Sequence, residues 1–275
     1  MNGRRGFRRG RKAYTRKSRK TTMLYKGKLM RVSPAIKKYV KSTIHKQIEN
    51  KGYQVQWSQT MGGYNSSNTL YAFPLTPYVG GLNIGQGVTQ STRIGNKIRA
   101  MRLKWNFILS LRPYDVATNP SPQPCEVMLM ICSLRPAIGE LPTAVDINNL
   151  YQSNATSIAP SGQIIDFTQK LNTDLFQVHK TMKFKIGFSS NSGTGSNAAY
   201  QSYNNNDYKV NINKSLNLTK YCPKVITYND NSSTPTSRCV FALWSIVPST
   251  GGTSFGAGVT PVRLDSTVML DYEDA

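Results

Sequence analysis

The stretch "RAMRLKWNFILSLR" (residues 99–112) decides the fold class of this chain. Every second residue from Met101 to Leu111 is apolar, and most residues between them are polar or charged. A period of two is typical of a β-strand that packs one face on a core. We therefore expect a strand whose inward residues are Met101, Leu103, Trp105, Phe107, Leu109 and Leu111.

Strand patterns recur along the chain after this stretch and once before it. The runs 125–134 and 239–247 are apolar on both faces, which predicts central strands of a buried sheet. A weaker pattern lies at 163–167. The eight expected strands are 53–60, 99–112, 125–134, 163–167, 176–188, 208–218, 239–247 and 266–272.

Long connections rich in Gly, Pro, Ser and Asn separate these strands. One helix is expected in the body, at Thr143–Tyr151, where Thr143 and Asp146 have capping-box spacing. Eight strands with long connections predict an all-β, antiparallel sandwich or barrel with one core. The connections are 61–92, 113–124, 189–207, 229–237 and 248–262.

The N-terminal end carries most of the net charge of +22. Residues 1–48 hold 17 of the 35 Lys and Arg and no acid, whereas residues 49–275 hold 18 basic and 13 acidic residues. A segment so charged buries too little apolar surface to offset its ordering entropy. We expect a mostly disordered arm over 1–32 that binds nucleic acid through phosphate, without reading sequence. A solubilising or targeting leader is the alternative.

The candidate nucleic-acid-binding residues are basic side chains of the arm and of the segment after it. Phe7 and Tyr14 would stack on unpaired bases. The run "RKAYTRKSRK" (11–20) also fits a nuclear-import signal. The candidates are Arg4, Arg5, Arg8, Arg9, Arg11, Lys12, Arg16, Lys17, Arg19, Lys20, Lys26, Lys28, Arg31, Lys37, Lys38 and Lys41.

A basic amphipathic linker helix is expected at 33–50. Ser33 is placed to cap it, and Pro34 suits the first helical position. Apolar residues recur every four positions and would dock on the body at 51–275, with lysines opposite. A helix on a membrane surface has the same pattern, but we expect no stable membrane insertion. The apolar stripe is Ile36, Val40, Ile44 and Ile48.

The residues that carry chemistry in enzymes form no recognisable motif here. His45 and His179 lie in no HExxH or triad context. The acidic end "LDYEDA" (270–275) is interpreted as a strand edge or a subunit contact, with a cation site as the least favoured alternative. We expect no enzyme, cofactor or metal. The cysteines lack CxxC spacing and are interpreted as buried hydrophobes in a reducing compartment: Cys125, Cys132, Cys222 and Cys239.

The order of several segments resembles the capsid proteins of small circular Rep-encoding single-stranded DNA viruses. The resemblance spans nearly the whole chain behind the Arg-rich arm, although 61–92 and 189–207 match nothing in that family. Its segments are "RIGNKIRAMRLKWNFILSL" (93–111), "DLFQVHKTMKFKIGF" (174–188), "KVNINKSLNLTKY" (209–221), "CVFALWSIV" (239–247) and "STVMLDYED" (266–274).

The resemblance implies a single eight-stranded jelly roll of two packed four-stranded sheets. Sixty copies, or a small multiple, would form an icosahedral shell with the arm inside, on a single-stranded DNA genome. Sixty arms would supply about 1,000 positive charges, the order of the phosphates of a very small genome. The protein would belong to the virion, assemble in the host nucleus and meet import factors. Arg99, Arg102 and Lys104 would line the shell interior or simply solvate a strand face.

Two other classes stay open, and two more are disfavoured. A coat protein of a small positive-strand RNA virus would share the arm, because the arm reads charge alone. A host chromatin- or ribosome-associated β-sandwich would also have a basic tail, but it would not need the five long loops for self-association. A sugar-binding jelly roll is disfavoured because no secretory signal is expected, and a nuclease because no acid cluster has metal-binding spacing.

Overall fold

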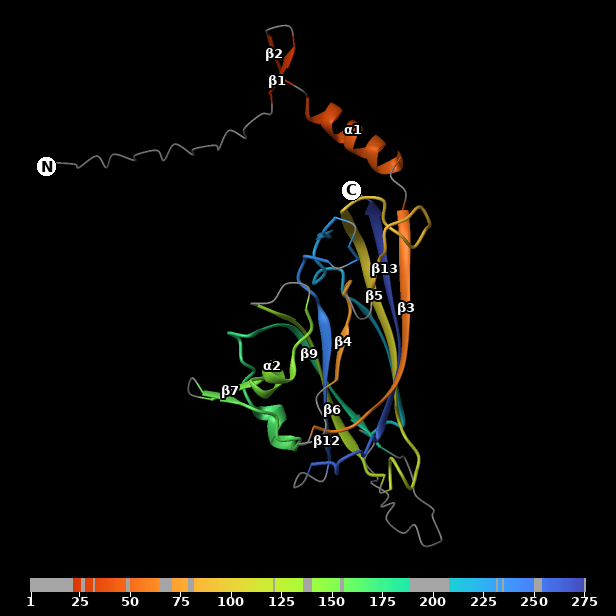
Figure 1. The fold of residues 1–275 in the computed structure, drawn as a ribbon, viewed down its shortest axis with the longest axis vertical. Helices are drawn as coiled ribbons and strands as arrows, with labels where there is room; N and C mark the ends of the chain where they lie inside the picture. The colour runs from red at the N-terminus through yellow and green to blue at the C-terminus, as the bar shows by residue number, and fades with distance from the viewer. Residues whose placement is uncertain are drawn as a thin grey trace, which may run out of the picture. The chain divides into compact units, whose positions relative to one another are not determined.

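The computed structural model divides the chain into two compact units, Met1–Ile48 and Glu49–Ala275 (Figure 1). The residues that the structure describes are 22–25, 28–31, 33–47, 50–64, 71–78, 82–120, 122–135, 140–153, 156–187, 208–230, 232–233, 235–249 and 254–274.

The N-terminal unit contains a hairpin and a helix. Strands β1 (Thr22–Tyr25) and β2 (Lys28–Arg31) pair antiparallel, and α1 (Pro34–Gln47) follows. The helix agrees with the expectation, but the hairpin lies within the segment expected to be mostly disordered. The two strands, TMLY and KLMR, hold several of the arm's few apolar residues, so this part can form local structure.

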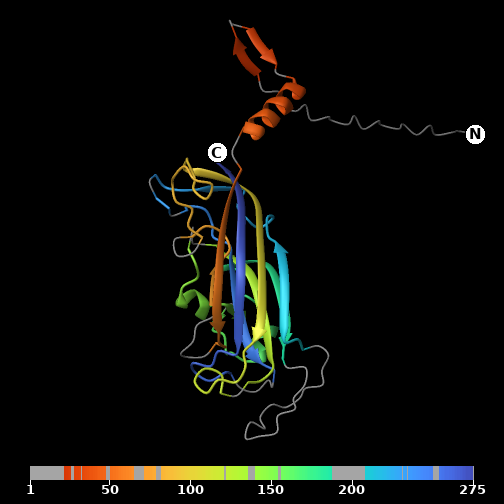
Figure 2. The ribbon, with the colours of Figure 1, turned by 90° about the vertical axis from the view of Figure 1, so that its right-hand side faces the viewer.

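Two antiparallel sheets build the C-terminal unit. One has the strand order β10-β5-β13-β3, with β11 added beside the start of β5, and the other has the order β4-β12-β6-β9. Figure 2 looks onto the first of these sheets. The strands are β3 (Asn50–Met61), β4 (Tyr71–Pro74), β5 (Lys97–Leu111), β6 (Cys125–Leu134), β9 (Phe176–Ile186), β10 (Asn211–Asn217), β11 (Val225–Thr227), β12 (Phe241–Pro248) and β13 (Val262–Asp274).

The strand order identifies the fold as a jelly roll. Leaving out the short strands β7, β8 and β11, the first sheet holds the first, eighth, third and sixth strands of the body, and the second sheet holds the second, seventh, fourth and fifth. The chain therefore passes to the other sheet after each strand, except between β6 and β9, which are neighbours in one sheet. This arrangement of two Greek keys is the double-sheet jelly roll, so the expected fold class is confirmed.

Seven of the eight expected strands are present, and one was wrong. Residues Ile164–Thr168 form a 3-10 helix instead. The carboxylate of Asp166 accepts hydrogen bonds from the backbone N–H groups of Ser161 and Gly162, at 2.9 and 2.8 Å, which holds this turn. The eighth strand of the jelly roll is β4, inside the expected loop 61–92. With four residues it is too short to show an alternation.

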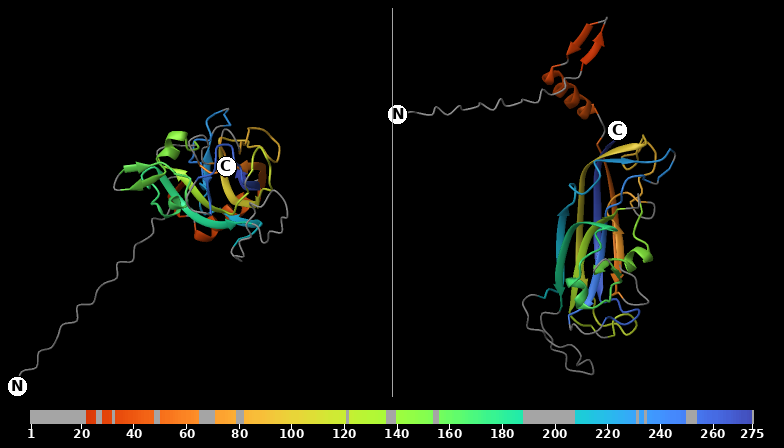
Figure 3. Two further views of the ribbon diagram at one scale, coloured as in Figure 1. Left: turned by 90° about the horizontal axis from the view of Figure 1, so that it is seen from below. Right: turned by 90° about the vertical axis from the view of Figure 1, so that its left-hand side faces the viewer.

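The main core lies between the two sheets. Trp105 of β5 meets Trp244 of β12 edge-on, with ring centroids 5.8 Å apart, and Phe107 meets Trp244 at 5.4 Å. A second cluster lies on the outer face of the four-stranded sheet. The connection between β6 and β9 covers it, with α2 (Ala144–Asn148), β7 (Tyr151–Ser153) and β8 (Thr156–Ile158) (Figures 1 and 3). Because β6 and β12 lie between both clusters, they are apolar on both faces.

A β-bulge changes the phase of β5. Arg102 pairs with Asp271, but Ala100 pairs with the next residue, Tyr272, so Met101 is the extra residue. The expected inward position of Met101 is therefore wrong, and its side chain is 44% exposed. The extra residue lets Ile98 and Leu103, an odd number of positions apart, both face the core.

Candidate nucleic-acid interface

Most of the predicted phosphate-binding residues lie outside the described residues. This holds for Arg4, Arg5, Arg8, Arg9, Arg11, Lys12, Arg16, Lys17, Arg19, Lys20 and Lys26. Lys28 and Arg31 begin and end β2, where their backbones pair with Tyr25 and Thr22. Lys37, Lys38 and Lys41 belong to α1.

The start of α1 separates basic from apolar side chains. The Ser33 hydroxyl accepts the Ile36 N–H at 3.2 Å, as expected of an N-cap. At 3.6 residues per turn, Ile36, Tyr39 and Val40 fall on one side, and the backbones of Lys37, Lys38 and Lys41 fall on the other. Ile36 and Val40 are about half exposed and Tyr39 more so. The start of the helix thus has basic residues on one side and apolar residues on the other.

The body has its own basic strip on the outer face of the five-stranded sheet. Lys97, Arg99, Arg102 and Lys104 occupy the first half of β5 and alternate with buried Ile98 and Leu103 around the bulge. The first three are exposed, and Lys104 is partly exposed. Lys224, whose carbonyl accepts the Ala100 N–H at 3.1 Å, is exposed beside them.

This strip lies at the end of the sheet where the N-terminal unit joins the body. Asn50, the first residue of β3, pairs with Glu273 of β13, which pairs with Arg99 of β5. The three residues therefore form one row across the sheet. The chain therefore enters the body at the row that contains Arg99.

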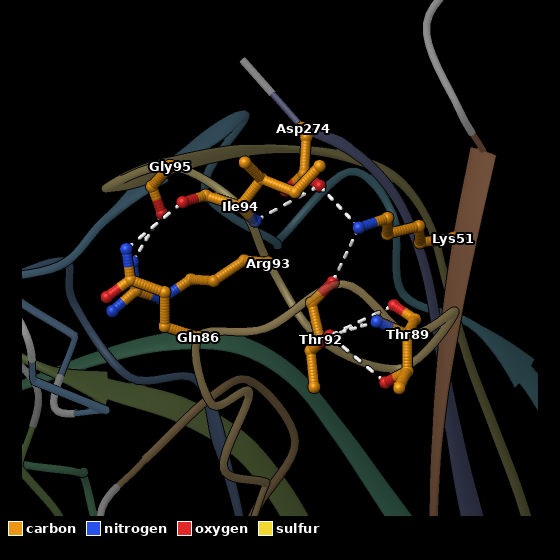
Figure 4. Close-up of polar contacts among 8 residues, drawn as sticks. All are labelled: Lys51, Gln86, Thr89, Thr92, Arg93, Ile94, Gly95 and Asp274. Carbon is orange, nitrogen blue, oxygen red and sulfur yellow. Dashed lines mark hydrogen bonds and ion pairs between the residues drawn. The ribbon is translucent and has the colours of Figure 1, made fainter.

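The acidic C-terminal residues pair with cations at this same end. The Nζ atom of Lys51 lies 2.7 Å from Oδ2 of Asp274 and donates to the Thr92 carbonyl at 2.9 Å (Figure 4). Asp274 Oδ2 also accepts the Ile94 N–H at 3.2 Å. Glu273 lies 3.5 Å from Arg99. The structure thus shows internal ion pairs at the sheet end, a role that the sequence analysis did not name for these acids.

Arg93 is a buried cation that the sequence did not reveal. It is fully buried, and its guanidinium donates to the carbonyls of Gly95 and Ser232 and to Asn96 Oδ1. It also lies over the Tyr228 ring, 4.2 Å from the centroid. These contacts fasten the connection before β5 to the loop after β11 (Figure 4 shows Arg93 and Gly95).

The cysteines and His179 have structural surroundings. All four cysteines are free and buried, and burial raises the pKa of the Cys132, Cys222 and Cys239 thiols to about 12, which keeps them protonated. His179 is half-buried rather than on an open strand face. Its ring stacks on Tyr221 at 5.1 Å and its Nε2 lies 3.2 Å from the Ser133 hydroxyl. Burial lowers the pKa of His179.

Two further observations concern only the part of the chain that the structure describes. There, no three or more His, Cys, Asp or Glu side chains gather in a group that could hold a metal ion. Within the same segments, no helix is both long and apolar enough to cross a membrane.

Comparisons with known proteins add a distant structural likeness. No family model matches the chain, and no curated protein does. Among solved structures, a chain of the cryo-EM structure of mud crab dicistrovirus aligns with 82% of this chain and 70% of its own, with a TM-score of 0.32 and 10% identity. The functional argument therefore depends on the fold and on the distribution of charge.

Proposed function

We propose that this protein is a viral capsid protein that assembles into an icosahedral shell and packages a single-stranded DNA genome through its basic N-terminal segment. One observation carries the proposal. A jelly-roll body is continuous with a segment of 48 residues that has 17 basic and no acidic residues. Jelly rolls occur in capsid and lectin domains, and the charge of the attached segment favours nucleic acid over sugar as the partner.

The position of the attachment supports the proposal. The chain enters the body at Asn50, in the row of the sheet that contains Arg99 of the basic strip. Nucleic acid held by the segment would therefore find a basic protein surface where the segment ends. The outer face of the five-stranded sheet would then be the side of the shell that meets the genome.

The proposed mechanism is binding and assembly, with no chemical step. Basic side chains replace the counterions of phosphates, which requires no fixed geometry and reads no sequence. The protein would act in the virion, as sixty copies or a small multiple. Single-stranded DNA and assembly in the host nucleus follow from the family resemblance, with import directed by residues 11–20.

The test compares the purified full chain with the same chain lacking residues 1–31. Negative-stain electron microscopy detects shells, and the ratio of absorbance at 260 and 280 nm detects packaged nucleic acid. We expect uniform shells from both chains and nucleic acid only in the full chain. Digestion of the extracted nucleic acid with DNase or RNase then separates a DNA virus coat from an RNA virus coat.

A pair of matched variants isolates the charge of the arm. The arm variant replaces Arg4, Arg5, Arg8, Arg9 and Arg11 by Gln, and the body variant replaces exposed Lys170, Lys180, Lys209, Lys214 and Lys220 by Gln. Both lower the net charge by five. We expect the arm variant to package clearly less nucleic acid than the body variant. If every chain formed only monomers or dimers over a range of salt concentrations, the capsid proposal would be wrong.

A further inference from the structure

The two sheets of the body have four edge strands, and an edge strand exposes unpaired N–H and C=O groups. Another strand can pair with these groups, so proteins protect their edges with short strands, proline or lysine. Leaving out the three-residue β11, which pairs with β5 alone, the edges are β3 and β10 in one sheet and β4 and β9 in the other.

Three of these edges show such protection. β4 has four residues and ends at Pro74. β9 carries Lys180, Lys183 and Lys185. β10 has seven residues with Lys214 at its centre, and a bridge between Ile186 and Lys209 ties the chain just before it to β9.

β3 differs from the other three edges. It has twelve residues, and from Gly52 to Met61 ("GYQVQWSQTM") it contains no charge and no proline. Its ladder with β13 runs from Asn50–Glu273 to Met61–Val262 without a register shift. On its other side, its backbone pairs with no other segment that the structure describes. Among the residues that the structure describes, β3 is therefore a long, regular and unprotected edge (Figure 2, at the side opposite β10).

The side chains of β3 suit contact with a second copy of the same chain. The body alone carries a net charge of +5, so copies that meet through lysine-rich surfaces repel one another. The outward side chains Gln54, Gln56 and Ser58 are exposed and neutral, and amide and hydroxyl groups can both donate hydrogen bonds to and accept them from like groups. The Ser58 hydroxyl already accepts a hydrogen bond from Arg263 at 3.1 Å. Two β3 edges can approach without placing like charges opposite each other.

The strand is also held in place before any partner arrives. At one end, Lys51 is buried and bound to Asp274 and to the Thr92 carbonyl. At the other end, Met61 is fully buried in the core. An edge already fixed in its paired geometry loses little conformational entropy on binding.

We propose that β3 joins two copies of this chain, the free edge of each β3 pairing antiparallel with the other around a two-fold axis. The two five-stranded sheets then form one continuous sheet. The contact is isologous, since both copies use the same surface. It deepens the proposed function by assigning one of the contacts that would build the shell, and it commits to a second copy as the partner.

Single-cysteine variants of the full chain test this contact. Gln54→Cys, Gln56→Cys and Ser58→Cys place thiols on one face of β3, while the native cysteines are buried. A disulfide requires Cβ atoms about 3.5–4.5 Å apart. Antiparallel pairing brings a residue opposite itself when the two-fold axis passes through that residue, and brings Gln54 opposite Gln56, or Gln56 opposite Ser58, when the axis passes through the residue between them. We expect one variant alone, or one mixture of two variants, to form a disulfide-linked dimer on mild oxidation in non-reducing gels, and the other combinations to form much less.

A matched control separates edge pairing from contact between sheet faces. Thr267→Cys lies on the same face as Gln56, opposite it in register, but on an inner strand. We expect no disulfide dimer from it. Dimers from Thr267→Cys equal to those from the best β3 variant would overturn edge pairing in favour of a face-to-face contact.

The outcomes distinguish this proposal from the proposed function. Particles without a β3 disulfide in any of the three variants, alone or mixed in pairs, overturn the β3 contact and leave the capsid proposal standing. A position-specific disulfide dimer without particles supports the β3 contact and contradicts the shell. A charge placed at the edge, Gln56→Lys, should weaken the contact and lower dimer or particle yield several-fold, whereas Thr267→Lys should not. Equal yields from these two variants also count against the contact.

Discussion

At the scale of single residues, the body depends on cations whose partners lie far away in the sequence. Lys51 has a side chain that is 0% exposed, and its partner Asp274 is 15% exposed. Removing one member of a buried ion pair leaves the other charge buried without a partner, which strongly lowers the free energy of unfolding. Replacing both members by apolar residues is often neutral. An exposed pair has no such penalty.

The first prediction concerns this pair. We expect Lys51→Met to lower the free energy of unfolding by about 3 kcal/mol, because Asp274 would stay mostly buried beside the Ile94 N–H. The control is Arg263→Met, which breaks an exposed pair with Asp265 and should change stability by less than about 1 kcal/mol. Urea unfolding of unassembled chains measures both. Equal effects would contradict the structural role of Lys51.

The second prediction is a pH dependence at His179. Burial lowers the pKa of His179 in the folded state, so the unfolded chain binds this proton more readily. Its contribution to stability is therefore full above about pH 6.5, the ordinary pKa, and is lost as the pH falls toward the folded pKa. We expect the free energy of unfolding to fall less between pH 7.5 and 5.5 in His179→Gln than in the unchanged chain. Parallel plots of unfolding free energy against pH for the two proteins would contradict this prediction.

At the scale of elements, strand β5 shows where a periodic pattern misleads. The alternation predicted the strand and the inward positions from Leu103 to Leu111, which the structure confirms. Met101 fits the same alternation but faces outward, because the bulge depends on the pairing with β13. The strand β4 and the 3-10 helix at Ile164–Thr168 were missed for a related reason. Each is short and is held by contacts with distant or side-chain partners.

The third prediction tests the bulge. We expect Met101→Ala to change the free energy of unfolding by no more than about 0.5 kcal/mol, because this side chain is largely exposed. Leu103→Ala, two residues further along, should cost about 2–5 kcal/mol, because Leu103 is fully buried. Thermal or urea unfolding distinguishes them. A cost for Met101→Ala close to that for Leu103→Ala would show that Met101 packs in the core.

At the scale of the whole molecule, the proposed function depends on a body with modest charge and an attached segment with high charge. Counterion release makes the affinity of such a segment fall with salt by a slope of about 0.7 per engaged charge on single strands. The same reasoning predicts no preference between DNA and RNA of equal length, since both carry the same phosphates.

The fourth prediction uses this slope. Below the concentration of assembly, replacing Arg4, Arg5, Arg8, Arg9 and Arg11 by Gln should reduce the salt slope for single-stranded DNA by about 3 to 4. The five-lysine body variant should reduce it less. Fluorescence anisotropy with labelled DNA and RNA oligomers measures both slopes. An unchanged slope in the arm variant would show that these arginines do not contact phosphate.

The amino-acid sequence by itself determined where seven of the eight jelly-roll strands lie and where the positive charge lies. Alternation and charge density depend on neighbours along the chain, so they are visible without a fold. Only the tertiary structure decided the pairing order of the strands, the bulge at Met101, the burial of Lys51 and Arg93, and the unprotected edge of β3. The first three depend on partners that lie far away in the sequence, as Ser232 lies 139 residues from Arg93. The edge of β3 depends on which strands of the fold lie beside it.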